Sequence, residues 1–175
     1  MSAQLPLTIP PIYSGRNDAI NDTGRTAFCG PYVVSAITGY PISRVEDEII
    51  AFRNVAAHEG NVSADDAEKE VKGTTTEDVA AALAHYGYQM RPVANYMDLP
   101  RKERPSVWSW MQRPRNAWSY YILAVHKGKV GHWVLIKGVK LCDTYSEGKW
   151  EFVCDGPHKG AKVMEIYEVK RRIDL

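Results

Sequence analysis

Hydrophobic residues recur three or four positions apart in the first half of the chain, and this spacing predicts helices. The first predicted helix begins at Cys29 and ends at Gly39. Pro31 suits a first helical turn, and Gly39 favours the left-handed conformation that stops a helix. The second predicted helix starts at Ser43, where Ser43 and Glu46 match a capping box, in which each side chain accepts from the other residue's backbone.

The third predicted helix runs from about Thr75 to Tyr86 and follows a second capping-box pattern. Thr74 and Glu77 have the spacing of that box, and Gly87 provides the stop. In the polar segment between the second and third helices, residues 63–71 are predicted to form a short helix.

Aromatic and β-branched residues dominate the second half of the chain and predict antiparallel strands after the helices. One or two helical turns are expected within residues 106–112. The predicted strands cover residues 87–93, 118–125, 130–139, 150–155 and 163–169, with turns at 126–129 and 143–148. Helices followed by a meandering antiparallel sheet indicate an α+β fold with one domain over residues 1–175, in which prolines and a glycine make residues 1–20 irregular.

Composition excludes several classes of function. The 175-residue chain has a formal net charge of +1 and 25% charged residues, with no basic stripe, so no nucleic-acid partner is expected. No apolar run is long enough for a membrane span, and no secretory signal is recognisable, so we expect a cytoplasmic protein. Three cysteines suit a reducing compartment. Without a Cys-x-x-Cys pair or a helical histidine pair, neither a metal nor a cofactor is expected. The pattern does not predict an oligomeric state.

Candidate chemistry centres on Cys29, because a helix N-terminus presents unpaired backbone N–H groups that favour a thiolate. His132 opens an otherwise apolar strand, where its ring can face a cleft and act as a base. Asp155 ends the following strand. If the hairpin turns between Asp143 and Thr144, His132 and Asp155 lie opposite each other with Cβ atoms ~5 Å apart; a turn one or two residues later would shift this register.

Cys29 and His132 also have ordinary, non-catalytic interpretations. A cysteine on a helix is often a small core residue, and a histidine at a strand entry is often without a role. The other histidines are weaker candidates: they lie at positions 58, 85, 126 and 158, with His158 either on the surface or behind the site. Cys142 and Cys154 are interpreted as structural thiols beyond disulfide reach of each other.

The order of these motifs resembles the papain-like cysteine peptidases. Cys29-Gly30-Pro31 opens a helix, residues 73–79 open another, and Gly131-His132-Trp133-Val134 precedes Cys154-Asp155-Gly156-Pro157. The similarity is greatest to the branch typified by bacterial double-glycine leader peptidases and their stand-alone relatives, and it covers roughly residues 20–160 by motif order.

The resemblance implies a papain-like fold and a cysteine peptidase acting on a peptide or protein substrate. It assigns Cys29 as nucleophile, His132 as general base and Asp155 as the residue that orients the imidazole. The family usually carries a glutamine about six residues before the nucleophile as an oxyanion donor. Thr23 occupies that position here, and Asn21 is the nearest amide that could replace the glutamine.

Two other readings stay open on these residues. The same three side chains serve deamidases and acyltransferases. Alternatively, the chain is a catalytically idle papain-like module that binds peptides or takes part in an assembly. Its contact aromatics would be Trp108, Trp110, Trp118 and Trp133, although core packing is the more ordinary use of tryptophan.

Overall fold

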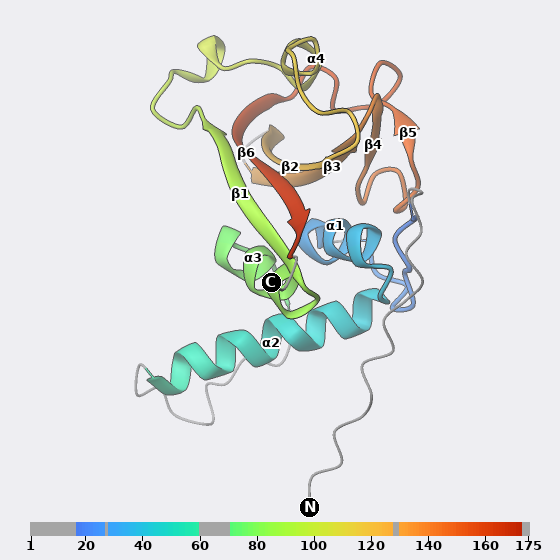
Figure 1. Ribbon diagram of the computed structural model, residues 1–175, viewed down its shortest axis with the longest axis vertical. Helices are drawn as coiled ribbons and strands as arrows, with labels where there is room; N and C mark the ends of the chain where they lie inside the picture. The colour runs from blue at the N-terminus through green and yellow to red at the C-terminus, as the bar shows by residue number, and fades with distance from the viewer. Residues whose placement is uncertain (1–16, 27, 60–70, 128–129, 173–175) are drawn as a thin grey trace, which may run out of the picture.

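The helices of the first half pack together below one end of the sheet (Figure 1). The structure, a computed structural model, describes residues 17–26, 28–59, 71–127 and 130–172. Its helical half consists of α1 (Cys29–Thr38), α2 (Ile42–Glu59) and α3 (Thr76–His85). The predicted helix at 63–71 and nearly all of the irregular segment at 1–20 fall outside the described residues. The three main helices are as the apolar spacing predicted, within a few residues at each end.

Helix α1 ends as predicted, whereas the start of α2 differs. Gly39 adopts a left-handed conformation (φ 76°) and its N–H donates to the carbonyl of Ser35 at the end of α1. Helix α2 begins at Ile42 rather than Ser43. The predicted capping box there is wrong, because Asp22 accepts from the Ser43 backbone N–H and hydroxyl while Glu46 pairs with Arg25. A distant segment of the chain therefore supplies the cap.

Helix α3 does have a capping box, one residue later than predicted. The Thr75 hydroxyl accepts from the Asp78 N–H, and the Asp78 carboxylate accepts from the Thr75 N–H. Arg53 of α2 donates to the same carboxylate, which explains why Asp78 rather than Glu77 turns inward. The box joins the start of α3 to α2 and fixes the loop that precedes it.

The second half forms one antiparallel sheet in the order β1-β6-β2-β3-β4-β5. The last strand in the chain inserts between β1 and β2, so the sheet is not the simple meander that was predicted. A short 3-10 helix and α4 cross from β1 to β2. The elements are β1 (Tyr88–Asn95), η2 (Arg101–Glu103), α4 (Val107–Met111), β2 (Tyr120–Lys127), β3 (Val130–Lys137), β4 (Lys140–Cys142), β5 (Glu151–Phe152) and β6 (Lys162–Arg171).

The hairpin after β3 turns earlier than predicted, and this changes the register. Lys137 pairs with Lys140, and Leu135 pairs with Cys142, across a turn that contains Gly138 at φ 62°. The turn near Asp143–Thr144 is real, but it connects β4 to β5 and not the strand of His132 to its partner. The predicted pairing of His132 with Asp155 is therefore wrong.

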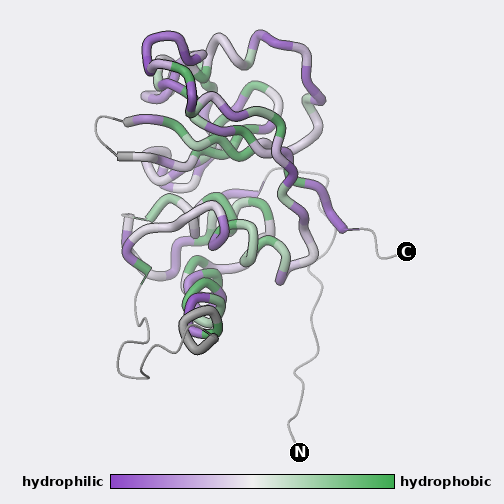
Figure 2. Tube along the Cα trace, turned by 90° about the vertical axis from the view of Figure 1, so that its left-hand side faces the viewer, coloured by the Kyte–Doolittle hydropathy of each residue, from purple (hydrophilic) through white to green (hydrophobic). Residues whose placement is uncertain are grey.

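Both faces of the central strands are buried. Alternating residues of β2 point to opposite sides: Ile122 and Ala124 pack against the helices, whereas Leu123 and Val125 pack with α4. Figure 2 shows apolar segments along the facing parts of the two halves. Of the tryptophans named above, Trp110 and Trp133 belong to the core, and Trp118 is 84% exposed. Among the described residues, no helix combines the length and apolar composition needed to cross a membrane.

Candidate active site

A pocket of about 1120 Å³ lies between the first turn of α1, the loop before α3 and the starts of β3 and the β4–β5 loop. Cys29 and His132 both line it, together with Thr74, Trp133 and Tyr145. Two of the predicted site residues, which are 103 positions apart in the sequence, therefore face one cavity. The helical half supplies the thiol and the sheet half supplies the imidazole.

Cys29 is the first residue of α1, and the contacts around it hold that helix end in place. The remaining residues of α1 are all buried. The backbone N–H of Trp133 donates to the Cys29 sulfur at 3.3 Å, and the Trp133 indole N–H donates to the Thr74 carbonyl at 3.3 Å. A Cβ atom at Gly30 would lie 2.2 Å from the Thr74 hydroxyl. Glycine is thus favoured here, because a Cβ atom could be accommodated only if the Thr74 side chain moved away from α1.

The surroundings of Cys29 favour the neutral thiol. Burial raises its pKa above the ordinary value, and the charge of Asp143 adds to this effect. The N–H groups of Trp133, Cys29 and Gly30 oppose the shift without cancelling it. The backbone donors expected at a helix start are present, but desolvation outweighs them. Attack by this sulfur consequently needs a base that removes its proton.

His132 lies near the start of β3 and is held by a carboxylate. Its Nε2 is 2.7 Å from Oδ2 of Asp143, in a contact where His132 is 9% exposed and Asp143 is fully buried. This hydrogen bond fixes the ring and leaves Nδ1 to take a proton. The imidazole is thus held in one orientation on the wall of the pocket that Cys29 also lines.

Both carboxylate oxygens of Asp143 have partners. Oδ1 accepts from the backbone N–H groups of Tyr145 and Ser146, each at 3.0 Å, and so closes the turn after β4. Oδ2 faces two imidazoles, those of His132 and His158. Burial alone would raise the pKa of Asp143, but the hydrogen bond from His132, the closeness of His158 and the backbone donor of Ser146 hold it well below its usual range. Asp143 is thus a carboxylate kept ionised inside the protein.

His158 is the second imidazole at this carboxylate. It is 1% exposed, and its Nε2 lies 2.6 Å from Oδ2 of Asp143. The ring is not aligned for a hydrogen bond, so Nε2 has no hydrogen-bond partner among the described residues. The rings of His132 and His158 stack with centroids 4.9 Å apart, and Tyr145 meets both edge-on at 5.2 and 5.0 Å. His158 is therefore buried behind the site and does not lie on the surface.

Asp155, the acid expected from the sequence, lies elsewhere. It is exposed in the turn after β5, where its backbone N–H donates to the carbonyl of Phe152. The carboxylate that the fold brings to His132 is Asp143, because the hairpin turns at Gly138. Asp143 directly follows the three-residue strand β4 and opens a turn, so its position depends on a register that periodicity does not specify.

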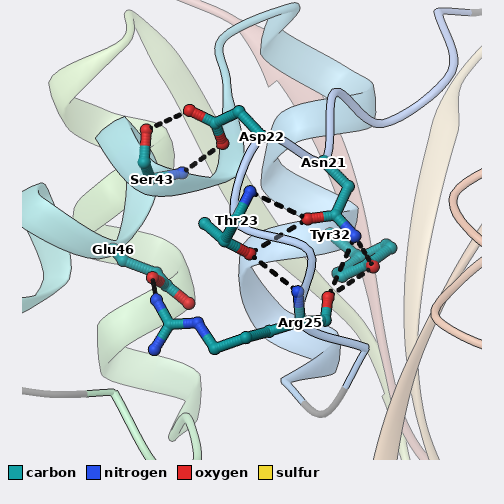
Figure 3. Close-up of polar contacts among 7 residues, drawn as sticks. All are labelled: Asn21, Asp22, Thr23, Arg25, Tyr32, Ser43 and Glu46. Carbon is teal, nitrogen blue, oxygen red and sulfur yellow. Dashed lines mark hydrogen bonds and ion pairs between the residues drawn. The ribbon is translucent and has the colours of Figure 1, made fainter.

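The Asn21 amide, expected as an oxyanion donor, is engaged in its own loop (Figure 3). Its Nδ2 donates to the Arg25 carbonyl at 3.0 Å and to the Tyr32 hydroxyl at 2.6 Å, while its Oδ1 accepts from Thr23. These two bonds use both hydrogens of the amide. Neither Asn21 nor Thr23 lines the pocket. The loop that leads to Cys29 is stabilised by Asn21, and the structure does not bring this amide to the sulfur.

Sequence reasoning missed Asp143 and left His158 undecided. One local signal for Asp143 was available. In many turns an aspartate side chain accepts hydrogen bonds from the backbone N–H groups two and three residues later. Gly138 between apolar runs also indicates a tight turn before Leu141. Cys142 and Cys154 are free, as is Cys29, and Cys154 is exposed whereas Cys142 is buried.

Comparisons with known proteins support the fold. No protein-family model matches the sequence, and no curated protein matches it. The structure is similar to the crystal structure of the peptidase domain of Streptococcus ComA, a bi-functional ABC transporter involved in a quorum-sensing pathway. The TM-score is 0.50 at 11% sequence identity, over 90% of this chain and 98% of that domain. The α+β papain-like fold expected from the sequence is confirmed.

Proposed function

We propose that the chain is a cysteine peptidase or related thiol hydrolase, in which Cys29 attacks a peptide or isopeptide carbonyl. The observation that carries the proposal is the shared pocket: Cys29 and His132 line one cavity, and Asp143 binds the far side of the imidazole. The similarity of the fold to a peptidase domain adds support.

His132 is given the central role in the proposed reaction. Its Nδ1 removes the thiol proton as the Cys29 sulfur bonds to the carbonyl carbon, and the same proton then passes to the leaving amine. Water then attacks the resulting thioester: His132 takes a proton from this water as its oxygen bonds to the carbonyl carbon, and it passes that proton to the departing Cys29 sulfur, so the acid and the thiol are released. Since burial raises the pKa of Cys29, the proton leaves during attack and not beforehand. Asp143 stabilises the imidazolium that forms.

The backbone N–H of Cys29 is the proposed donor to the developing oxyanion. Because Asn21 uses both amide hydrogens in its own loop, its assignment as a second donor has no support. Losing one oxyanion donor lowers rates by about 10²–10³-fold. We therefore expect a slower enzyme than relatives that carry the glutamine.

A second reading is an idle papain-like module that binds a peptide in the same pocket. Two observations favour it: the raised pKa of Cys29 and the engaged amide of Asn21. The pair formed by His132 and Asp143 favours the enzyme, because an imidazole held by a buried carboxylate on the pocket wall is what activation of a thiol requires.

The rate of iodoacetamide alkylation at each cysteine, followed by mass spectrometry, separates these readings. Cys154 is exposed and serves as an internal reference in the same sample. If His132 activates the sulfur, Cys29 reacts faster than Cys154 at about pH 7, and His132→Ala lowers its rate by about 10²-fold or more.

His85→Gln is the matched control, since His85 is an exposed imidazole at the end of α3. It should leave both rates unchanged. If Cys29 reacts more slowly than Cys154 in the wild type and His132→Ala has no effect, the enzyme reading fails and the binding module replaces it.

A further inference from the structure

Beyond the proposed hydrolase, we infer that His132, Asp143 and His158 form a binding site for one divalent transition-metal ion of the zinc class. Their ligand atoms, one nitrogen of each imidazole and one carboxylate oxygen, all lie within 4.8 Å of one another. Two imidazoles and one carboxylate are a common protein ligand set for such ions.

The orphaned nitrogen of His158 is the observation that points to a ligand. Its Nε2 is buried and is not aligned with the Asp143 oxygen 2.6 Å away. The buried nitrogen thus makes an ionic contact but no aligned hydrogen bond, and this misalignment has a cost in free energy. An ion that accepts the lone pair of this nitrogen would remove that cost, and it would also separate the two imidazoles that now converge on one oxygen.

The two N–O separations need only a small change to hold an ion. Bonds of about 2.0–2.1 Å in a tetrahedral site place the ligand atoms about 3.3 Å apart. The present N–O separations are 2.7 and 2.6 Å, so these two contacts would lengthen by about 0.6 and 0.7 Å to match such bond lengths. Oδ1 of Asp143 already accepts from two backbone N–H groups, which is the kind of outer support that metal-bound carboxylates have.

Access to the ion site is through the pocket. His132 and Tyr145 line the pocket, and the Tyr145 ring, which is 55% exposed, stands edge-on to both imidazoles. An ion would therefore enter past the side chains of His132 and Tyr145. The fourth position of the ion would then face the pocket and take water.

The ion would also regulate the proposed activity, a consequence that rests on the proposed function. A metal on Nε2 of His132 replaces its hydrogen bond to Asp143 and withdraws electrons from the ring, so Nδ1 becomes a weaker base. The inferred site thus competes with thiol activation. Its occupancy, in contrast, does not depend on any catalysis.

Titration of the full chain with Co²⁺, followed by visible absorption, tests the site directly. One ion per chain should bind, with the visible bands of a nitrogen- and oxygen-ligated site and without a sulfur-to-cobalt charge-transfer band. Cys29→Ser should leave the spectrum and affinity unchanged. His158→Gln, which keeps a polar side chain of similar length, should weaken binding by about 100-fold.

His85→Gln is the matched control for binding at an exposed imidazole, because His85 contacts only the carboxylate of Glu48 among the ionic contacts of the described residues. It should not alter binding. A charge-transfer band that disappears in Cys29→Ser would overturn the inference, as would binding that His158→Gln leaves intact or the absence of stoichiometric binding. If His158→Gln does not fold, the wild-type and Cys29→Ser spectra still decide, because together they show whether sulfur or only nitrogen and oxygen bind the ion.

Discussion

Replacing Asp143 with asparagine tests whether Asp143, and not the Asp155 expected from the sequence, orients His132. Asparagine retains one oxygen, so it can still accept from the N–H groups of Tyr145 and Ser146 that Oδ1 accepts from now. The other end of the side chain becomes an NH₂ group facing the two imidazoles. His132 must then accept at Nε2, which places its hydrogen on Nδ1 and removes the base.

The expected loss of hydrolysis rate is large, because nearly every molecule of the variant would carry the His132 tautomer that cannot act as the base. Losing the orienting carboxylate of such a triad costs about 10³–10⁴-fold in rate. Hydrolysis of p-nitrophenyl acetate that depends on Cys29 gives the measurement, since it passes through an oxyanion and an acyl-enzyme. Asp155→Asn is the matched control, and its exposed side chain should change the rate less than about 2-fold.

Stability gives the same substitution a second readout. The lowered pKa of Asp143 means that its ionised form stabilises the folded state above the ordinary aspartate pKa, and that this contribution is lost as the pH falls. Asp143→Asn should therefore reduce the free energy of unfolding by about 1.5–3 kcal/mol at neutral pH. The substitution should also make the free energy of unfolding, measured by urea titration, depend less on pH in the acid range. An equal loss of rate in Asp155→Asn, or an unchanged rate in Asp143→Asn, would refute the reasoning.

Three further predictions concern the surroundings of the site. Gly30→Ala should cost about 1–3 kcal/mol in urea unfolding, because its Cβ would meet Thr74, whereas Gly73→Ala, with nothing near its Cβ, should cost less. Burial raises the pKa of Cys142 to about 12. The folded thiol therefore keeps its proton while the unfolded thiol loses it, and stability should fall by about 1.4 kcal/mol per pH unit above about pH 8.5, a slope that Cys142→Ala should remove. Asn21→Ala should lower stability by about 1 kcal/mol yet leave ester hydrolysis nearly unchanged; a 10²-fold loss of rate would restore its oxyanion role.

The helices and the first two site residues could be predicted because each depends on local signals. Cys29 starts a helix whose apolar face, proline and terminal glycine lie within eleven residues. His132 begins a strand whose hydrophobic run is continuous. Both residues therefore sit at element ends that neighbouring residues specify, and a fold that packs those ends together brings them to one pocket.

The carboxylate that contacts His132 could not be predicted in the same way, because its identity depends on where the hairpin after β3 turns. The hairpin turns at Gly138 instead of at Asp143, so the strand paired with β3 has only three residues. Asp143, which follows that strand, therefore lies beside His132 in place of Asp155. Side-chain period fixes which face a residue occupies but not which residue lies opposite it. The α2 cap failed for a related reason: Asp22, twenty-one residues before Ser43, supplies the acceptor.

The candidate site lies where the helices pack against one face of the sheet in a shared core, and this makes its chemistry sensitive to that packing. Trp133 links the halves directly, because its backbone N–H reaches the Cys29 sulfur and its indole N–H reaches the Thr74 carbonyl. The same packing desolvates Cys29 and raises its pKa. Packing that holds the sulfur in place therefore also favours its protonated form. In the proposed reaction an oriented base resolves that conflict, so we expect the bond between His132 and Asp143 to matter for reactivity as much as the thiol itself.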